Sequence, residues 1–129
     1  MLLYNIGKFS TSFYSKLVKN TMNQQVQVIK LSGIINTANS QELREEITHL
    51  LNSGTKIVLV DCQDVIFMDS SALGALVLAF KTLRAAGTKL FLCSINEQVR
   101  ILFELTGMDK VFEIFNNQDE FNQIILANS

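Results

Sequence analysis

The chain has 129 residues, of which 48% are hydrophobic and 18% charged, and its formal net charge is −1. This length suits one domain with a single core, and the composition is that of a globular protein rather than a disordered one. Lys and Arg do not gather into a basic stripe, so we expect no direct binding of nucleic acid. No apolar run approaches the roughly 20 residues that span a bilayer, so we expect no membrane insertion.

The few cysteine and histidine residues argue against a metal site or a disulfide framework. Cys62 and Cys93 each end or follow an apolar, strand-like run, which favours reduced and buried thiols. His49 is the only histidine, and no Cys-x-x-Cys spacing is present. His49 falls near the polar flank of a predicted helix, where a solvated side chain is the simpler interpretation. We therefore predict no metal ligands and no cofactor.

Residues 1–21 contain lysines but no acidic residue, together with several Ser and Thr. A targeting segment has this composition, although a secretory signal would also have an apolar core and a cleavage site. A start codon at Met22 is a second interpretation, and an edge strand at residues 13–18 is a third. We favour a loosely ordered N-terminal arm over residues 1–21, with or without that strand. The well-patterned domain then covers residues 22–129, and the arm is expected to be dispensable for the fold.

From Met22 onward, strand and helix patterns alternate. Residues 26–31 predict a strand that ends at Gly33, and residues 36–40 are a cluster of helix-capping types. The helix that follows closes at residues 52–54, whose Asn and Gly suit a C-terminal cap. Residues 57–60 form an unbroken apolar run, typical of a parallel strand buried on both faces.

The second half of the chain repeats this alternation. A helix from about Ser70 to Ala86 precedes another buried strand, and Asn96 is expected to cap a third helix that stops at Gly107. The remaining predicted elements are a strand at Val111–Phe115 and a helix around Phe121–Ile125. Strands that alternate with amphipathic helices predict an α/β layer fold with right-handed crossovers.

The stretch from Val65 to Gly74 is the most informative part of the chain. An apolar run leads to Asp69, and a helical stripe of apolar residues begins at Leu73. Asp69, Ser70 and Ser71 therefore lie in the first helical turn, where one capping side chain satisfies the free backbone N–H groups. Three capping residues in a row exceed that need. The surplus hydroxyl requires an explanation.

The sequence of this stretch does not match known motifs of catalytic nucleophiles. The strand-to-helix elbow of esterases needs Gly-x-Ser-x-Gly, but Met68 and Ala72 stand at the glycine positions here. A triad would need His49 as its base, and nothing places that residue beside Ser70. The phosphate-binding Gly-x-x-x-x-Gly-Lys loop is absent from the sequence. We expect no catalytic residue and no enzyme activity.

Residues 67–74, Phe-Met-Asp-Ser-Ser-Ala-Leu-Gly, resemble the phosphorylation loop of STAS domains, in particular the bacterial anti-sigma factor antagonists, whose motif is Asp-Ser-Ser/Thr-Gly-Leu-Gly. The likeness extends from about Val26 to the C-terminus and includes residues 31–33, 57–61, 90–93 and 106–108. The resemblance implies a single STAS domain of the α/β class. Its small mixed, largely parallel sheet would have four to five strands and about four helices, mostly on one face.

The resemblance also implies a phospho-switch. The unphosphorylated chain would bind a serine-kinase anti-sigma factor and so free a sigma factor for transcription, while phosphorylation of Ser70 would release the partner. A PP2C-type phosphatase would reset the switch. Such a protein would be cytoplasmic and a monomer or weak dimer. The rival interpretation is a STAS subunit of a membrane transport assembly of the phospholipid-transport type, which docks without phosphorylation.

Matching the motif residue by residue gives the expected roles. Ser70 matches the phosphoacceptor, Ser71 supports the helix start, and Asp69 is both a cap and part of the surface that the kinase contacts. Leu73 would anchor the helix, and Gly74 would allow close approach of backbone. Asn36 and Asp64 complete the expected partner-binding region, and Asp64 or Asp61 would join Asp69 in repelling a phosphate at Ser70. The chain departs from the motif at Ala72, where the family has Gly, and at Asn36, where many antagonists have an acidic residue.

Overall fold

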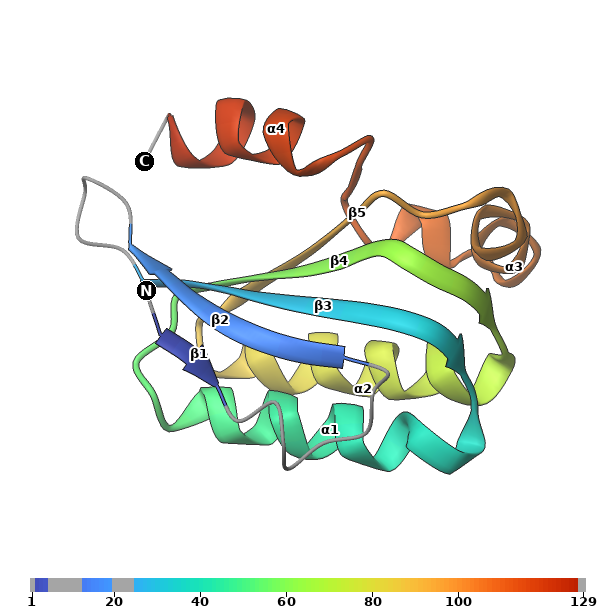
Figure 1. Cartoon of the computed structure of the whole chain (residues 1–129), viewed down its shortest axis with the longest axis horizontal. Coiled ribbons are helices and arrows are strands. Elements are labelled where there is room, and N and C mark those ends of the chain that lie inside the picture. The colour runs from blue at the N-terminus through green and yellow to red at the C-terminus, as the bar shows by residue number, and fades with distance from the viewer. Residues whose placement is uncertain (1, 5–12, 20–24, 128–129) are drawn as a thin grey trace.

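The computed structural model describes residues 2–4, 13–19 and 25–127, and within them six strands form one sheet in the order β1-β2-β3-β4-β5-β6 (Figure 1). The strands are β1 (Leu2–Tyr4), β2 (Phe13–Lys19), β3 (Gln25–Ile35), β4 (Ile57–Met68), β5 (Lys89–Cys93) and β6 (Ile114–Phe115). The helices are α1 (Thr37–Leu51), α2 (Ser70–Ala85), α3 (Glu97–Thr106) and α4 (Gln118–Phe121), the last continued by a π-helical turn at Asn122–Leu126.

The sheet is mixed, as the resemblance implies. The pairs β3–β4, β4–β5 and β5–β6 are parallel, whereas β1–β2 and β2–β3 are antiparallel. The predicted α/β class is confirmed. The described strands number six rather than four to five, because β1 and β2 extend the sheet beyond β3.

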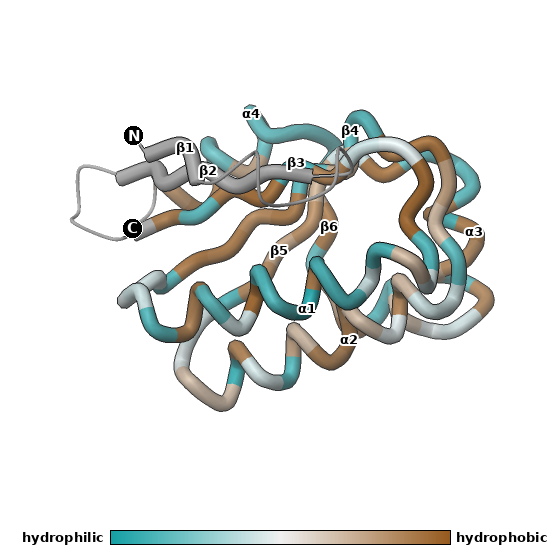
Figure 2. The backbone as a smooth tube through the Cα atoms, turned by 60° about the horizontal axis from the view of Figure 1, so that its bottom comes forward, coloured by the Kyte–Doolittle hydropathy of each residue, from teal (hydrophilic) through white to brown (hydrophobic). Residues whose placement is uncertain are grey.

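Two apolar clusters cover the two faces of the sheet. The larger one joins the sheet to α1, α2 and the buried side of α3, and the smaller one lies beneath Phe121 of α4. Three of the four helices therefore lie on one face, and Figure 1 shows α4 across the other. In Figure 2 the central strands are largely hydrophobic, while hydrophilic and hydrophobic residues alternate along α1. No helix within residues 2–4, 13–19 and 25–127 is long and apolar enough to cross a membrane.

Strand β4 is longer than the predicted run at residues 57–60 and continues to Met68. Its pairing with β3 shifts register twice: Ile29 faces Val60, but Ile35 faces Met68, so six residues on β3 match eight on β4. Each extra residue is a bulge, which turns neighbouring side chains outward and bends the strand. Ile66 and Phe67 are consequently exposed between the buried Val65 and Met68.

The N-terminal segment contains a strand, β2, where one of its three interpretations placed an edge strand, but β1 pairs with its other side and is the edge of the described sheet. Strand β2 pairs with β3 over seven residue pairs, from Phe13–Leu31 to Lys19–Gln25. Residues 1, 5–12 and 20–24 lie outside the described part of the chain. The domain boundary at Met22 stays a prediction, but the pairing makes β2 part of the same sheet as β3.

The predicted helix ends are largely confirmed, and one predicted strand is shorter than expected. Asn96 caps α3 through a bond from the Val99 N–H, and Gly107 ends that helix in the left-handed conformation. The strand expected at residues 111–115 is reduced to Ile114–Phe115. A short 3₁₀ turn at Met108–Lys110 precedes it, and the N–H groups of residues 111 and 112 donate to the Met108 carbonyl instead of to a strand.

Candidate functional site

Two helices begin side by side where β3 and β4 end. Ile35 and Met68 close the parallel pairing of these strands, and the Asp69 N–H donates to the Ile35 carbonyl at 3.1 Å. Because both strands run in the same direction, the helix that follows each one starts at the same edge of the sheet (Figure 1). The motif at the start of α2 therefore lies beside the start of α1.

Asp69 is the cap of α2. Its backbone is extended, its carboxylate accepts the Ala72 N–H at 3.0 Å, and its carbonyl accepts the Leu73 N–H at 3.1 Å. Leu73 is 4% exposed and belongs to the larger apolar cluster, which confirms it as the residue that anchors the helix. Asp69 already provides the side-chain cap by accepting the Ala72 N–H, so neither serine is needed in that role.

The two serines of the motif have different environments. Ser70 is exposed at the first position of α2, and no described residue hydrogen-bonds its hydroxyl. Ser71 is half-buried, and its hydroxyl shares a 2.8 Å hydrogen bond with the hydroxyl of Thr37, the first residue of α1. The surplus hydroxyl therefore belongs to Ser70. Thr37 was missed by the sequence analysis, although it lies in the capping cluster at residues 36–40.

Asn36 caps α1 in the same way. Its side chain accepts the Ala38 N–H at 2.9 Å, while its own N–H donates to Asn39 Oδ1 at 2.8 Å, so the two residues form a capping box. The Asn39 amide in turn donates to the Ile34 carbonyl at 2.7 Å. These bonds confirm that Asn36 retains the capping ability expected of it, at the edge that also carries Ser70.

One residue expected at the site behaves differently from the prediction. Gly74 is exposed on α2, and a side chain there would meet no atom within 4 Å, so no backbone approaches it within the described structure. The expectation of a close approach at Gly74 is wrong, because that position of the helix faces away from the sheet. Asp64 lies on β4, before the helix, and forms an ion pair with Lys30 at 3.4 Å.

Asp61 is also separate from the first turn of α2. It is 3% exposed, and its carboxylate accepts the Gln63 N–H at 3.0 Å. Of the three acidic residues considered at the site, Asp69 alone belongs to the helix start. At the start of α2, the carboxylate that a phosphate at Ser70 would meet is that of Asp69.

Helix α3 fixes the end of β4 from the side. Gln98 bonds both backbone groups of Met68, and the Asn96 amide donates to the carbonyls of Val65 and Ile66 at 3.0 and 3.2 Å. The bulged strand is thus held by two amide side chains. The sequence analysis missed this role, because Asn96 has the sequence pattern of an ordinary helix cap.

An apolar rim borders the motif. Ile34, Ile66 and Phe67 are 53%, 70% and 43% exposed, and Ile34 pairs with Phe67 across β3 and β4. Large apolar side chains grouped on a surface are typical of a protein interaction site. These three residues, called here the apolar rim, lie at the strand ends from which α1 and α2 start.

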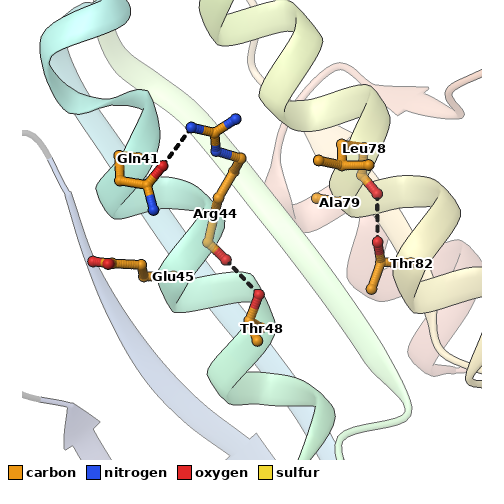
Figure 3. A pocket seen from close by; sticks show the side chains of 7 residues that line it. All are labelled: Gln41, Arg44, Glu45, Thr48, Leu78, Ala79 and Thr82. Atoms are coloured by element: carbon orange, nitrogen blue, oxygen red, sulfur yellow. Dashed lines mark hydrogen bonds between the residues drawn. The ribbon is translucent and has the colours of Figure 1, made fainter.

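A cavity of about 550 Å³ forms a separate groove between α1 and α2 (Figure 3). Its polar groups bond to one another: Arg44 donates to Gln41, and the hydroxyls of Thr48 and Thr82 donate to the carbonyls of Arg44 and Leu78. Gln41 lies one turn beyond Thr37, so the groove begins next to the site. Among its lining residues, no unpartnered buried polar group points to a ligand.

The two cysteines lie in the core on opposite faces of the sheet, Cys62 in the larger apolar cluster and Cys93 in the smaller. Burial raises the pKa of the Cys62 thiol well above its ordinary value, and burial together with Asp61 raises the pKa of Cys93 to about 12. Both thiols are therefore protonated at neutral pH, as expected for structural cysteines.

The comparisons with known proteins agree with the fold. The model of the STAS domain matches residues 18–121. The anti-sigma-B factor antagonist of Staphylococcus aureus is 26% identical over 97 residues, which are 75% of this chain and 90% of that protein. The crystal structure of TM1081 from Thermotoga maritima superposes with a TM-score of 0.76 at 25% identity, covering 86% of this chain and 92% of that one.

Structures of the Bacillus protein SpoIIAA in its unphosphorylated and phosphorylated forms have the same fold. Their TM-scores are 0.67 and 0.63 at 17% and 16% identity; they cover 84% of this chain and 96% and 99% of theirs. The family model covers most of the chain, and the mixed α/β fold with most helices on one face is the one that the resemblance implies. The chain belongs to the STAS domain family, among relatives named as bacterial anti-sigma factor antagonists.

Proposed function

We propose that the chain is a non-enzymatic, cytoplasmic phospho-switch that acts as an anti-sigma factor antagonist. Unphosphorylated, it binds a serine-kinase anti-sigma factor and frees a sigma factor for transcription. The kinase transfers a phosphoryl group from ATP to Ser70, which releases the complex, and a PP2C-type phosphatase removes the phosphate. One observation carries the proposal: the Ser70 hydroxyl is exposed and unbonded within the described structure, whereas Asp69 and Ser71 are both engaged.

The helix start lets the domain accept this modification without unfolding. A phosphoserine adds about −1.5 to −2 charges and three acceptor oxygens. At the first position of α2 these oxygens lie near free N–H groups and the positive end of the helix dipole, a stabilisation of about 0.3–1 kcal/mol at an exposed site. Repulsion from Asp69 opposes that gain, so we expect the free energy of unfolding to change little.

The same charge is costly at an interface. We assign the apolar rim to the partner's docking surface, because Ile66 and Phe67 are exposed on the strand that leads into the motif. A partner that covers the rim would remove water from Ser70 as well. A doubly charged group in a partly dry contact is strongly unfavourable unless it is paired.

The test measures partner affinity and the free energy of unfolding on the same samples. A purified anti-sigma serine kinase is incubated with the chain, Mg²⁺ and ATP, and peptide mass spectrometry locates the phosphate. We expect phosphate on Ser70 in the wild type and only slow labelling, at Ser71, in Ser70→Ala. Phosphorylation should abolish binding with little change in stability, and Ser70→Asp should imitate it only in part. A loss of affinity no larger than the loss of stability would indicate an order–disorder switch instead.

The apolar rim is tested by two matched substitutions. Ile66→Ser should weaken kinase binding at least about tenfold, equivalent to about 1.4 kcal/mol. Leu105→Ser is the control, because Leu105 is 82% exposed on α3 but lies outside the rim. Equal effects of the two substitutions would show that the rim is not the docking surface. Binding to a transporter ATPase, with no phosphorylation by any anti-sigma kinase, would support the rival transport role.

A further inference from the structure

We propose that Thr37 is a positioning residue that makes Ser70, and not the adjacent Ser71, the phosphoacceptor. The inference rests on the proposed function and concerns a choice that two neighbouring serines leave open. Both hydroxyls lie in the first turn of α2, and the sequence motif alone gives no physical reason for one to react and the other not to react. The structure supplies one, from a residue 34 positions away.

Thr37 occupies the hydroxyl of Ser71. The two oxygens are 2.8 Å apart, and either group can be the donor. Ser71 is half-buried between the starts of α1 and α2, whereas Ser70 is exposed and has no partner among the described residues. The Ser71 hydroxyl must therefore give up its hydrogen bond to Thr37 before it can react. Ser70 has no such bond to lose.

The position of Thr37 is itself fixed by the start of α1. Asn36 and Asn39 form the capping box on either side of it, and the Asn39 amide holds the Ile34 carbonyl at 2.7 Å. Thr is branched at Cβ and adopts mainly two rotamers in a helix, of which the one found here directs the hydroxyl to Ser71. The Thr37 hydroxyl is thus held toward Ser71 by its own helix before any partner binds.

The bond is open to solvent, because Thr37 is exposed, so its effect on phosphoryl transfer comes from the direction that it gives to the Ser71 oxygen. The serine Oγ forms a bond to the γ-phosphorus of a nucleoside triphosphate while the bond from that phosphorus to the β,γ-bridging oxygen breaks. The nucleoside diphosphate leaves, and the hydroxyl proton passes to a base of the kinase. The attacking oxygen must face the phosphorus in line with the leaving oxygen. At Ser71, Thr37 fills one approach to the oxygen and directs its hydrogen bonding toward α1.

The experiment compares two substitutions of Thr37 in a chain that lacks the preferred acceptor. Thr37→Val keeps the branched shape and removes the hydroxyl, and Thr37→Ser keeps the hydroxyl. In the Ser70→Ala background, a purified anti-sigma serine kinase with Mg²⁺ and ATP should label Ser71 at least tenfold faster when Thr37→Val is added. Thr37→Ser should leave the labelling at the Ser70→Ala level. Fragment-ion mass spectrometry distinguishes phosphate on residue 71 from phosphate on residue 70.

The outcomes separate this inference from the proposed function. Normal phosphorylation of wild-type Ser70 with no gain at Ser71 in the Thr37→Val chain would overturn the role of Thr37 and leave the switch intact. The absence of phosphate from wild-type Ser70 would overturn both. A double-mutant cycle in urea unfolding, with Thr37→Val and Ser71→Ala, tests the hydrogen bond without a kinase. Additive effects in that cycle would also overturn the inference.

Discussion

Gln98 of α3 bonds the backbone of Met68 at both of its polar groups: the Met68 N–H donates to Gln98 Oε1 and Gln98 Nε2 donates to the Met68 carbonyl, each at 2.8 Å. Met68 still pairs with Ile35 of β3, and the Gln98 side chain supplies the partners that β5, whose pairing with β4 ends at Asp61, no longer offers. It holds the residue immediately before Asp69, so α3 sets the position of the motif without contributing to the motif itself.

The two hydrogen bonds between Gln98 and Met68 should contribute measurably to the free energy of unfolding. Gln98→Ala leaves two half-buried backbone groups of Met68 without this partner, and we expect the free energy of unfolding to fall by about 1–3 kcal/mol. Gln123→Ala, at an exposed glutamine near the C-terminal end of the chain, serves as the control and should change stability by less than about 0.5 kcal/mol. Urea unfolding of both variants measures the difference. Equal stabilities would mean that water replaces Gln98 without cost.

Gly74 and Gly33 should respond to alanine with opposite signs. Gly74 lies in α2 with open space around it, so Gly74→Ala should raise stability by up to about 1 kcal/mol through helix propensity. Gly33 also has open space, but its φ of +77° is unfavourable for alanine, and Gly33→Ala should lower stability by about 1–2 kcal/mol. Thermal unfolding measures both. If Gly74→Ala also weakens kinase binding, the partner approaches the helix at that position.

The two buried thiols predict a loss of stability in alkali. A thiol that stays protonated when folded and ionises when unfolded favours the unfolded chain as the pH rises above its ordinary pKa of 9.0. Stability should therefore be unaffected by these groups at neutral pH and fall from about pH 9 toward pH 12. The double variant Cys62→Ala, Cys93→Ala should have a flatter pH dependence over that range, whatever its absolute stability. Identical slopes would show that the thiols ionise in the folded state.

Deleting residues 1–21 tests two opposed expectations. The weak pattern before Met22 predicts that they are dispensable, whereas the seven-residue pairing of β2 with β3 predicts that their loss exposes the edge of β3. We expect a chain that starts at Met22 to lose more than about 1–2 kcal/mol and to self-associate through that edge. A chain that starts at Thr11 keeps β2 and is the matched control. Urea unfolding and sedimentation measure the two effects.

Local chemistry explains which parts of this fold are predictable. Asn36, Asp69 and Asn96 cap their helices through bonds to residues two or three positions ahead, so the sequence alone predicts them. The exposure of Ile66 and Phe67 is different, because an apolar run indicates burial. The exposure of these two side chains depends on the bulges in the pairing of β4 with β3, and the local sequence does not specify those bulges.

The candidate site also has features that the local sequence predicts and one that depends on the assembled sheet. The motif predicts the start of α2 and the anchor at Leu73, but the difference between Ser70 and Ser71 comes from Thr37. That contact exists because β3 and β4 are adjacent and parallel, a property of the assembled sheet. The assignment of Ser70 as phosphoacceptor stays a prediction.

The two bulges make the motif sensitive to chain length more than to residue type. Between Ile29 and Ile35 the chain advances six residues on β3, and eight residues on β4 cover the same distance. Substituting one of the exposed residues in that stretch leaves this count unchanged. Deleting one of them would shift the register of the following residues by one position. A different side chain would then occupy the exposed position that Ser70 has now. Variation in this segment of related chains should therefore consist of substitutions, with insertions and deletions confined to other loops.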